Sequence, residues 1–197
     1  MTDYRKKGIT NDLEEQLSKR RAVELWDLGM IDTFEVGTFR GLQQIHEYLF
    51  QDVFLAPGEV RNVDIAKGNF RFASHLYLSE SIPVVERMPE DSFEAIIEKY
   101  VEMNILHPFR EGNGRSGRIW LDCILKARLG VCVDWSQVEK EAYLSAMERS
   151  PVNSLELKVL LKTALTDRIG EREVFMKGIE HSYYYEGYEK YEMDLLN

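Results

Sequence analysis

The sequence predicts an all-α fold, a compact helical bundle that carries one short β-hairpin. Three observations favour this class: apolar residues recur at helical spacing along most of the chain, helix stop signals follow several of these stretches, and only one stretch alternates as a strand does. The chain has 197 residues, of which 44% are hydrophobic. A domain of this length buries roughly 70% of the surface that its unfolded chain exposes, so it needs no disulfide or metal to fold.

Two helices are predicted in the N-terminal part of the chain. The first covers residues 18–28, and Gly29 is its stop signal. The second covers residues 41–50, where three apolar side chains at helical spacing form one face: Leu42, Ile45 and Leu49.

A single β-hairpin is predicted over about residues 62–73. Its turn is Lys67-Gly68-Asn69, whose residue types favour tight turns, and short apolar–polar alternation flanks the turn on both sides. Helical spacing resumes over residues 75–88. Pro83 is expected to kink or split that helix, because proline lacks an N–H group and its ring clashes with the preceding turn.

The clearest helix is predicted over residues 92–106, and it must pack in the core. Asp91 and Glu94 suggest a capping box at its start. Its apolar residues recur at helical spacing: Phe93, Ile96, Ile97, Tyr100, Val101 and Ile105. His107-Pro108 ends the helix, since the residue before a proline is pushed out of the α region.

Further helices complete the predicted bundle. A second strongly apolar helix covers about residues 113–129, with Gly130 as its C-terminal stop. Two more helix starts are predicted at residues 136–139 and 153–156, and a last helical segment at 174–189. No internal repeat and no Pro/Ser-rich linker interrupts the chain.

The stretch HPFREGNGRSGR, residues 107–118, lies between the two strongest helical patterns and has the composition of an anion site. Unpaired N–H groups at a helix start point outward, and the helix dipole favours negative charge there. Gly112 and Gly114 let backbone amides approach a phosphate closely. Asn113 can cap the helix or donate to the anion.

Charged and titratable side chains flank these amides. Arg115 and Arg118 are three residues apart, so they are expected to share a helix face that suits a polyphosphate. Glu111 would repel a phosphate unless a cation lay between them, and a carboxylate with phosphate oxygens is an ordinary Mg²⁺ environment. The stretch offers no good covalent nucleophile, so His107 is expected to act as a base on an incoming hydroxyl. The alternative is a capped helix start with solvated arginines, which explains an isolated GNG better than the whole stretch.

The stretch resembles the Fic motif, HPFx(D/E)GNGRxxR, at every fixed position. The resemblance extends over most of the chain, with the hairpin as a flap, and implies a Fic-fold helical bundle with its catalytic domain over residues 1–177. It implies transfer of AMP from ATP onto a hydroxyl side chain of an intracellular target protein, either Ser, Thr or Tyr, with release of pyrophosphate.

The same resemblance implies a role for each motif residue. His107 deprotonates the target hydroxyl, and Glu111 holds Mg²⁺ between the α- and β-phosphates. The amides of Gly112, Asn113 and Gly114 cradle the phosphates. Arg115 and Arg118 hold the β- and γ-phosphates.

The sequence SYYYEG near the C-terminus resembles the inhibitory (S/T)xxxE(G/N) motif of Fic proteins. Its position is similar to that in class III, the small members that carry an inhibitory helix in cis, here expected within residues 178–197. Ser182 and Glu186 are four residues apart and so on one helix face, and Gly187 completes the motif. The resemblance implies that Glu186 pairs with Arg118, the arginine that the γ-phosphate needs, and that the protein forms a homo-oligomer.

Four further side chains are weaker candidates. Lys67 on the hairpin is expected to contact nucleotide or target, and the resemblance implies that the hairpin aligns the target chain by strand-like pairing. Asn104 is a candidate nucleotide contact, with a buried and satisfied amide as the alternative. Leu144 is a candidate wall of an adenine pocket, with core packing as the alternative. Tyr183 is the first candidate for self-modification, because its hydroxyl is held near the site.

Composition narrows the function classes. A formal net charge of −9 disfavours general binding to nucleic acid. Cys123 and Cys132 form neither a disulfide framework nor a metal-ligand spacing, and no signal peptide or long apolar run is visible, so a cytoplasmic location is expected. Two alternatives stay open: removal of AMP from a modified protein, with Glu186 positioning a water, and a non-catalytic nucleotide-binding regulatory module.

Overall fold

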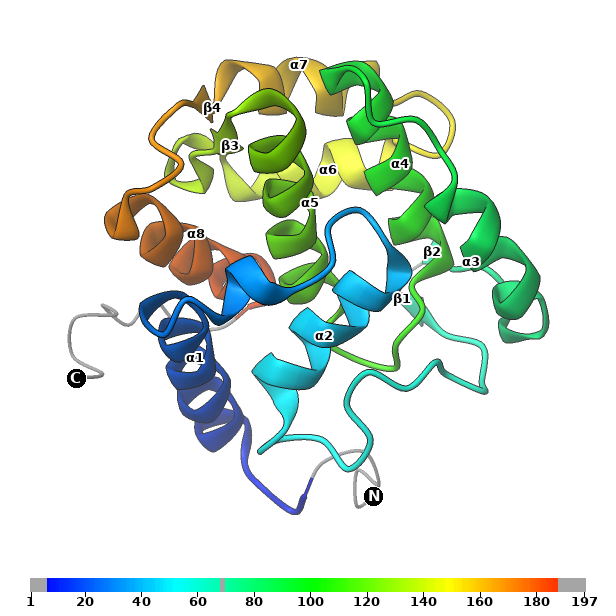
Figure 1. Cartoon of the computed structure of the whole chain (residues 1–197). Coiled ribbons are helices and arrows are strands. Elements are labelled where there is room, and N and C mark those ends of the chain that lie inside the picture. The colour runs from blue at the N-terminus through cyan, green and yellow to red at the C-terminus, as the bar shows by residue number, and fades with distance from the viewer. Residues whose placement is uncertain (1–6, 68–69, 188–197) are drawn as a thin grey trace.

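The computed structural model describes residues 7–67 and 70–187, and within those ranges it contains eight α-helices and two two-stranded sheets (Figure 1). The helices are α1 (Asn11–Asp27), α2 (Phe39–Phe50), α3 (Leu78–Glu86), α4 (Phe93–Leu106), α5 (Asn113–Leu129), α6 (Lys140–Arg149), α7 (Leu155–Thr163) and α8 (Arg172–Tyr185). Three short 3₁₀ turns join them: η1 (Met30–Thr33), η2 (His75–Tyr77) and η3 (Trp135–Gln137). This arrangement confirms the predicted all-α class.

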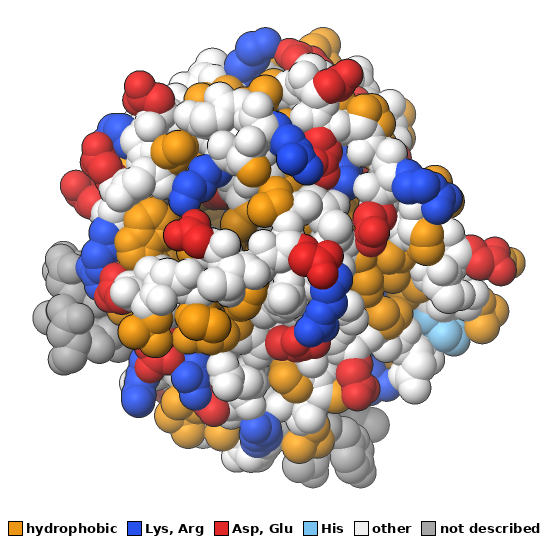
Figure 2. Space-filling model, in the orientation of Figure 1, with side chains coloured by type: hydrophobic (Ala, Val, Ile, Leu, Met, Phe, Trp, Pro, Cys, Tyr) orange, Lys and Arg blue, Asp and Glu red, His pale blue; other side chains and the backbone are white. Residues whose placement is uncertain are grey.

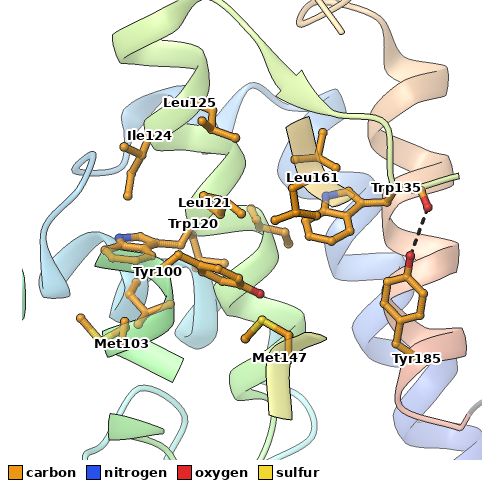
Figure 3. Packing of buried hydrophobic residues seen from close by; sticks show 14 of the residues in the cluster. Tyr100, Met103, Trp120, Leu121, Ile124, Leu125, Trp135, Met147, Leu161 and Tyr185 are labelled. Atoms are coloured by element: carbon orange, nitrogen blue, oxygen red, sulfur yellow. Dashed lines mark hydrogen bonds between the residues drawn. The ribbon is translucent and has the colours of Figure 1, made fainter. Parts of the chain in front are cut away.

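Helix α5 runs through the middle of the bundle, with α4 on one side and α8 on the other, and it also packs against α2 (Figure 1). Four of its side chains are fully buried: Trp120, Leu121, Ile124 and Leu125. Figure 3 shows that Trp120 lies beside Tyr100 and Met103 of α4. Because the second half of the glycine-rich stretch, residues 113–118, forms the start of α5, this packing fixes that part of the stretch in the molecule.

Helix α1 begins at Asn11, seven residues before the predicted start. Thr10 caps it, since the Thr10 hydroxyl oxygen accepts a hydrogen bond from the N–H of Leu13 at 3.3 Å. The apolar spacing did not predict the first two turns of α1, because the buried face of these turns carries Glu14 and Glu15. Acidic residues are rarely buried unless they are paired, so sequence reading placed these turns outside the helix.

The helices predicted over residues 75–88 and 92–106 are present as α3 and α4, with two corrections. Ser92, not Asp91, caps α4, because its hydroxyl oxygen accepts from the N–H of Ala95 at 3.2 Å. Helix α3 is not split at Pro83 and continues to Glu86.

The sheets are short and antiparallel. The predicted hairpin consists of β1 (Ala66–Lys67) and β2 (Phe70–Arg71). A second pair, β3 (Cys132–Val133) with β4 (Leu165–Thr166), was not predicted, because two-residue strands leave no alternation to detect. Gly68 and Asn69, which were expected at the turn, lie outside the described residues.

The C-terminal helices also begin later or end earlier than predicted. Helix α6 starts at Lys140, after the 3₁₀ turn η3, and α8 ends at Tyr185. The expected boundary at residue 178 falls inside α8, and the expected tail beyond Gly187 lies outside the described residues.

Positive and negative side chains are interspersed on the face of the molecule that Figure 2 shows, and neither sign gathers into one patch there. Among the helices of the described ranges, none combines the length and the apolar character that crossing a membrane requires.

Candidate active site

A cleft of about 810 Å³ opens beside the start of α5. The β1–β2 hairpin, the end of α4, the loop that precedes α5, helix α6 and the residue after α8 all contribute to its walls. Seven residues of the stretch 107–118 line it: His107, Arg110, Glu111, Gly112, Asn113, Gly114 and Arg118. The structure therefore brings most of the motif together around one space.

His107 follows the last residue of α4 and has a left-handed backbone, with a φ of 46°. Its Nδ1 lies 3.1 Å from the carbonyl oxygen of Asn104. A carbonyl oxygen only accepts, so Nδ1 carries the proton in this contact and Nε2 keeps its lone pair. The ring of Phe72 stacks on the imidazole, with centroids 3.7 Å apart. Burial lowers the pKa of His107 to about 4, so the imidazole is a neutral base near pH 7.

The first turn of α5 presents backbone N–H groups to the cleft. Gly112 is its N-terminal cap residue, with a φ of 77°, and no side chain caps the turn. A Cβ atom at Gly112 would lie 2.5 Å from the ring of Phe50, so only glycine fits there. A Cβ atom at Gly114 would lie 2.3 Å from Oε1 of Glu186. A carboxylate thus lies against the helix start where an anion is expected.

Asn113 holds the loop rather than capping the helix. Its Oδ1 accepts from the N–H of Phe109 at 2.8 Å, and its Nδ2 donates to the Phe109 carbonyl at 2.7 Å. The expected side-chain cap is therefore not seen, while Asn113 still lines the cleft and its contact with an anion stays a prediction. His46 supports the same loop, because its Nε2 lies 2.9 Å from the Glu111 carbonyl oxygen. The glycine-rich stretch is held from two sides.

Arg118 is buried and bonded to the end of α8. Its Nε donates to the Ser182 hydroxyl at 2.8 Å, and its Nη2 donates to the Ser182 carbonyl at 3.1 Å and to Oε1 of Glu186 at 3.0 Å. Its Nη1 lies 3.4 Å from the hydroxyl of Tyr143. The N–H donors of this guanidinium are thus mostly hydrogen-bonded to oxygens of the protein itself.

Glu186 bridges α5 and the hairpin. Its Oε2 lies 3.4 Å from Nζ of Lys67, while Oε1 contacts Arg118. Burial alone would raise the pKa of Glu186, but the positive charges of Arg118 and Lys67 lower it to about 2. Gly187 follows with a φ of 91°, a left-handed conformation that suits glycine at a helix end.

Arg115 differs from its prediction, because its guanidinium does not line the cleft. Its Nη2 lies 3.0 Å from Oε1 of Glu14 on α1, and both side chains are almost fully buried. The guanidinium also lies over the rings of Phe50 and Tyr183. The side chain of Arg115 is thus committed to the joint between α1, α5 and α8, and the expected phosphate contact is not seen.

Of the four weaker candidate residues, three lie at the cleft and one does not. Lys67, Asn104 and Leu144 all line the cleft. Tyr183 does not, since it is 1% exposed between the cations of Lys19 and Arg115. The Tyr183 side chain is buried in this conformation, so self-modification there, which stays a prediction, would require α8 to undock.

Sequence reading missed several residues at the cleft. Tyr143 lines it and contacts both Arg118 and the hydroxyl of Tyr100, the latter at 2.6 Å. Phe72 stacks on His107, and Met147 and Glu148 complete the wall from α6. A tyrosine at helical spacing is indistinguishable from core, so no local signal marked Tyr143.

Comparisons with known proteins agree with this geometry. A profile of the Fic/DOC family matches residues 38–125, which include the hairpin and the whole glycine-rich stretch. The chain is 30% identical over 178 residues to the probable protein adenylyltransferase Fic of Escherichia coli K12, and the alignment covers 83% of this chain and 88% of that relative. It is 33% identical to the protein adenylyltransferase VbhT of Bartonella schoenbuchensis over 68% of this chain and 30% of that protein.

Solved structures share the fold at lower identity. The N-terminal Fic domain of an effector protein from Bartonella sp. AR 15-3 has a TM-score of 0.68 at 19% identity, covering 83% of this chain and 87% of that one. BepC from Bartonella tribocorum, determined with bound AMPPNP, has a TM-score of 0.63 at 19% identity, covering 82% and 91%.

Proposed function

This chain belongs to the Fic/DOC family, and we propose that it catalyses the reaction for which its curated relatives are named, the transfer of AMP to a protein. The donor is ATP, the acceptor is a hydroxyl side chain of a target protein, and pyrophosphate leaves. One observation carries the proposal: a neutral histidine, an exposed carboxylate, the amides of a helix start and a buried arginine converge on a single cleft.

His107 is the general base in this reaction. Its Nε2 takes the proton of the target hydroxyl while the hydroxyl oxygen forms a bond to the α-phosphorus of ATP. The bond between that phosphorus and the oxygen bridging to the β-phosphate breaks, and pyrophosphate carries the electron pair away. The Nδ1 contact with Asn104 and the stacked ring of Phe72 fix the imidazole plane, which supports this role.

The phosphates are held by backbone amides and one arginine. Gly112, Asn113 and Gly114 line the cleft at the start of α5, where backbone N–H groups and the helix dipole favour an anion. Arg118 holds the γ-phosphate once its present partners release it. Lys67, Asn104 and Leu144 line the part of the cleft that the adenosine of ATP occupies in this proposal.

A divalent cation fits this site only together with phosphate oxygens. Among the described residues, no group of three or more His, Cys, Asp or Glu side chains could hold a metal ion by itself. Glu111 lines the cleft beside the amide cradle, and one carboxylate plus phosphate oxygens suits Mg²⁺. Glu111 would hold the ion, which would neutralise charge on the α- and β-phosphates.

The cleft is auto-inhibited in this conformation by Glu186. The carboxylate accepts a hydrogen bond from Arg118, and an arginine engaged with a carboxylate cannot also bind the γ-phosphate in the same geometry. Ser182 supports this contact, because it accepts two further hydrogen bonds from the same guanidinium. The sequence SYYYEG that carries Ser182 and Glu186 resembles the inhibitory motif of class III Fic proteins, and this resemblance also favours a homo-oligomer.

The target protein reaches the α-phosphate along the hairpin. Strand β1 pairs with β2 on one edge, and the hairpin forms one wall of the cleft next to His107. An extended target segment can add to the hairpin by main-chain hydrogen bonds, which present its hydroxyl to the imidazole without requiring a particular sequence.

A labelling experiment tests the proposed function. The protein, its Glu186→Gly variant and the Glu186→Gly/His107→Ala double variant are each incubated in a lysate with ATP labelled on the α- or the γ-phosphate. Label from the α-phosphate should enter protein strongly with Glu186→Gly and not with the double variant. Transfer of the γ-label would indicate a kinase, and transfer of neither label would contradict the proposed function.

Removal of AMP is a second candidate, because the Glu186 carboxylate is ionised and lies in the same cleft. Such a carboxylate can position a water for attack on the phosphorus of a modified side chain. Release of AMP from a target that Glu186→Gly has already modified, by wild-type protein but not by Glu186→Gly, would favour this activity.

A further inference from the structure

Arg61 is a buried arginine outside the family motif, in the segment that leads into the β1–β2 hairpin. Its side chain is fully buried, and the guanidinium donates four hydrogen bonds to backbone carbonyl oxygens. The nearest carboxylate oxygen that contacts it belongs to Asp64, is 4.0 Å away and is mostly exposed. The positive charge is therefore compensated mainly by peptide dipoles. A planar fork of five N–H donors suits this task, whereas lysine offers three donors on one nitrogen.

The four carbonyl groups belong to two different elements. Nε donates to His107 at 2.8 Å and Nη2 to Leu106 at 3.0 Å, so the last carbonyls of α4 find their donors here. Nη1 donates to Val63 at 2.6 Å and Nη2 also donates to Ala73, the residues that flank the hairpin on either side. One side chain thus joins the base of the hairpin to the backbone of the catalytic histidine.

Backbone contacts strengthen the same joint. The N–H of Arg61 donates to the Pro108 carbonyl at 2.8 Å, and the N–H of Ala73 donates to the Ile105 carbonyl at 3.0 Å. Phe72, the residue before Ala73, stacks on the His107 imidazole. If the hairpin base moved, this ring would move with it and the imidazole would lose its support.

We infer that Arg61 is a positioning residue for the AMP transfer proposed above, because it fixes His107 and the target-binding hairpin in one register. His107 has a left-handed backbone that few non-glycine residues adopt, and such a conformation persists only where its surroundings enforce it. Arg61 supplies that enforcement by binding the carbonyl of His107 itself. Both the base and the surface that presents its substrate depend on the one guanidinium.

This role predicts a defect in catalysis rather than in ATP binding. The amide cradle and Arg118 do not contact Arg61, so the Michaelis constant for ATP should change little. The imidazole and the target hydroxyl would no longer be aligned, and a displacement of ~1 Å can lower the rate on the order of 10²-fold. We therefore expect kcat to fall by about that factor in Arg61→Gln and by less in Arg61→Lys.

The test compares these variants, each in the Glu186→Gly background, with a matched control. Lys99 is also a buried cation, bonded to the Glu86 carbonyl and the Glu90 carboxylate, and it does not line the cleft. Lys99→Met should lower the free energy of unfolding while leaving kcat of the folded protein near that of Glu186→Gly.

A second readout does not depend on AMP transfer. The titration of the His107 ring is followed by NMR in the otherwise wild-type protein and assigned with His107→Ala. Burial lowers the pKa of His107, the hydrogen bond to the Asn104 carbonyl and the Glu186 carboxylate oppose this, and the cations of Lys67 and Arg61 lower it further. Removing Arg61 takes away one cation and loosens the Phe72 contact, so the midpoint should move upward toward 6.5. Lys99→Met should not move it.

One outcome would overturn the inference, and two others are separated from it by the choice of variants and readouts. A folded Arg61→Gln or Arg61→Lys protein with the kcat of the Lys99→Met control and an unchanged His107 midpoint would overturn it. If Arg61→Gln does not fold, Arg61→Lys retains the charge without the fork and carries the same test. If no variant transfers AMP at all, the proposed function fails while the titration still decides whether Arg61 positions His107.

Discussion

Nη2 of Arg118 and Oε1 of Glu186 lie 3.0 Å apart, joining the first turns of α5 to the residue that follows α8. The two residues are 68 positions apart in the sequence, and each is held by its own element. Arg118 is buried in the core, whereas Glu186 stands at a helix end where hydrogen bonding is weakest. Opening the contact by loss of the last turn of α8 would free Arg118, but it would also expose Tyr183 and Tyr185, which are buried in the core.

We predict that His107→Ala, in the Glu186→Gly background, lowers AMP transfer by ~10²–10⁴-fold while ATP affinity stays nearly unchanged. In the proposed mechanism the imidazole acts on the target hydroxyl, and other groups hold the phosphates. Incorporation of α-labelled AMP and calorimetric binding of ATP measure the two quantities separately. Near-normal transfer by this variant would show that another group is the base.

We predict that stability rises with pH between about pH 4.5 and 6.5 because His46 is buried as a neutral ring. Its Nδ1 accepts from the N–H of Gly58 at 2.9 Å, so protonation would break that bond. Burial, the largest cause, lowers the pKa of His46 to about 3, against 6.5 in the unfolded chain. The unfolded chain then binds more protons in this window, and the free energy of unfolding falls as pH falls, by up to ~1.4 kcal/mol per pH unit.

His107 adds to this slope with the same sign, since its pKa is also lowered. The ionised Glu186 contributes only below about pH 4.5, because its lowered pKa makes stability fall as pH drops from 4.5 toward 2. Urea denaturation at pH 6.5 and pH 5 measures the slope. His46→Gln should flatten it, and an equal slope in that variant would contradict the assignment to His46.

We predict that Arg115→Ala acts mainly on stability. The variant removes the cation beside the buried Glu14 carboxylate, and breaking a buried pair from one side costs about 3–5 kcal/mol. Urea denaturation should show this loss, and Arg115→Met combined with Glu14→Gln should recover part of it. If Arg115→Ala is as stable as the wild type but binds ATP many-fold more weakly, Arg115 contacts a phosphate of ATP as the sequence predicted.

The sequence could predict those site residues that lie close together in one short segment of the chain. His107 to Arg118 stand in one loop and one helix start, so their spacing alone placed most of them around the same cleft. The fold class followed from helical periodicity, because the long helices α4 and α5 are buried along most of their length. Such signals are local in sequence and can be detected without a structure.

What could not be predicted depends on contacts between distant residues. Arg115 was expected beside Arg118, but its partner Glu14 is 101 positions away and lies in a turn that the apolar pattern did not reveal. Arg61 stands in a polar segment that looks like a surface loop, and only the folded chain places four carbonyl oxygens around it. Contacts between residues far apart in the sequence determine where these two arginines lie, and such contacts produce no pattern of fixed spacing in the sequence.

We predict that Glu186→Gly raises AMP transfer strongly and that the effect requires Arg118. The wild-type arginine has two possible partners, the Glu186 carboxylate and the γ-phosphate, and its geometry serves only one at a time. With the carboxylate docked, ATP binds with its α-phosphate misaligned for attack, and ~1 Å of misalignment lowers the rate on the order of 10²-fold. The KM for ATP and kcat of both proteins, measured with α-labelled ATP, should show the gain mainly in kcat.

A double-mutant cycle isolates the coupling between the two residues. Arg118→Ala alone should be inactive, because the phosphate contact is lost together with the bonds to Ser182. Adding Glu186→Gly to it should recover little activity, since the group that the substitution frees is gone. Ser182→Ala is the matched control, because it removes one bond of Arg118 but leaves the carboxylate in place, so its activation should be weaker. Equal activation by Glu186→Gly with and without Arg118 would mean that the end of α8 inhibits by filling the cleft and not by competing for the arginine.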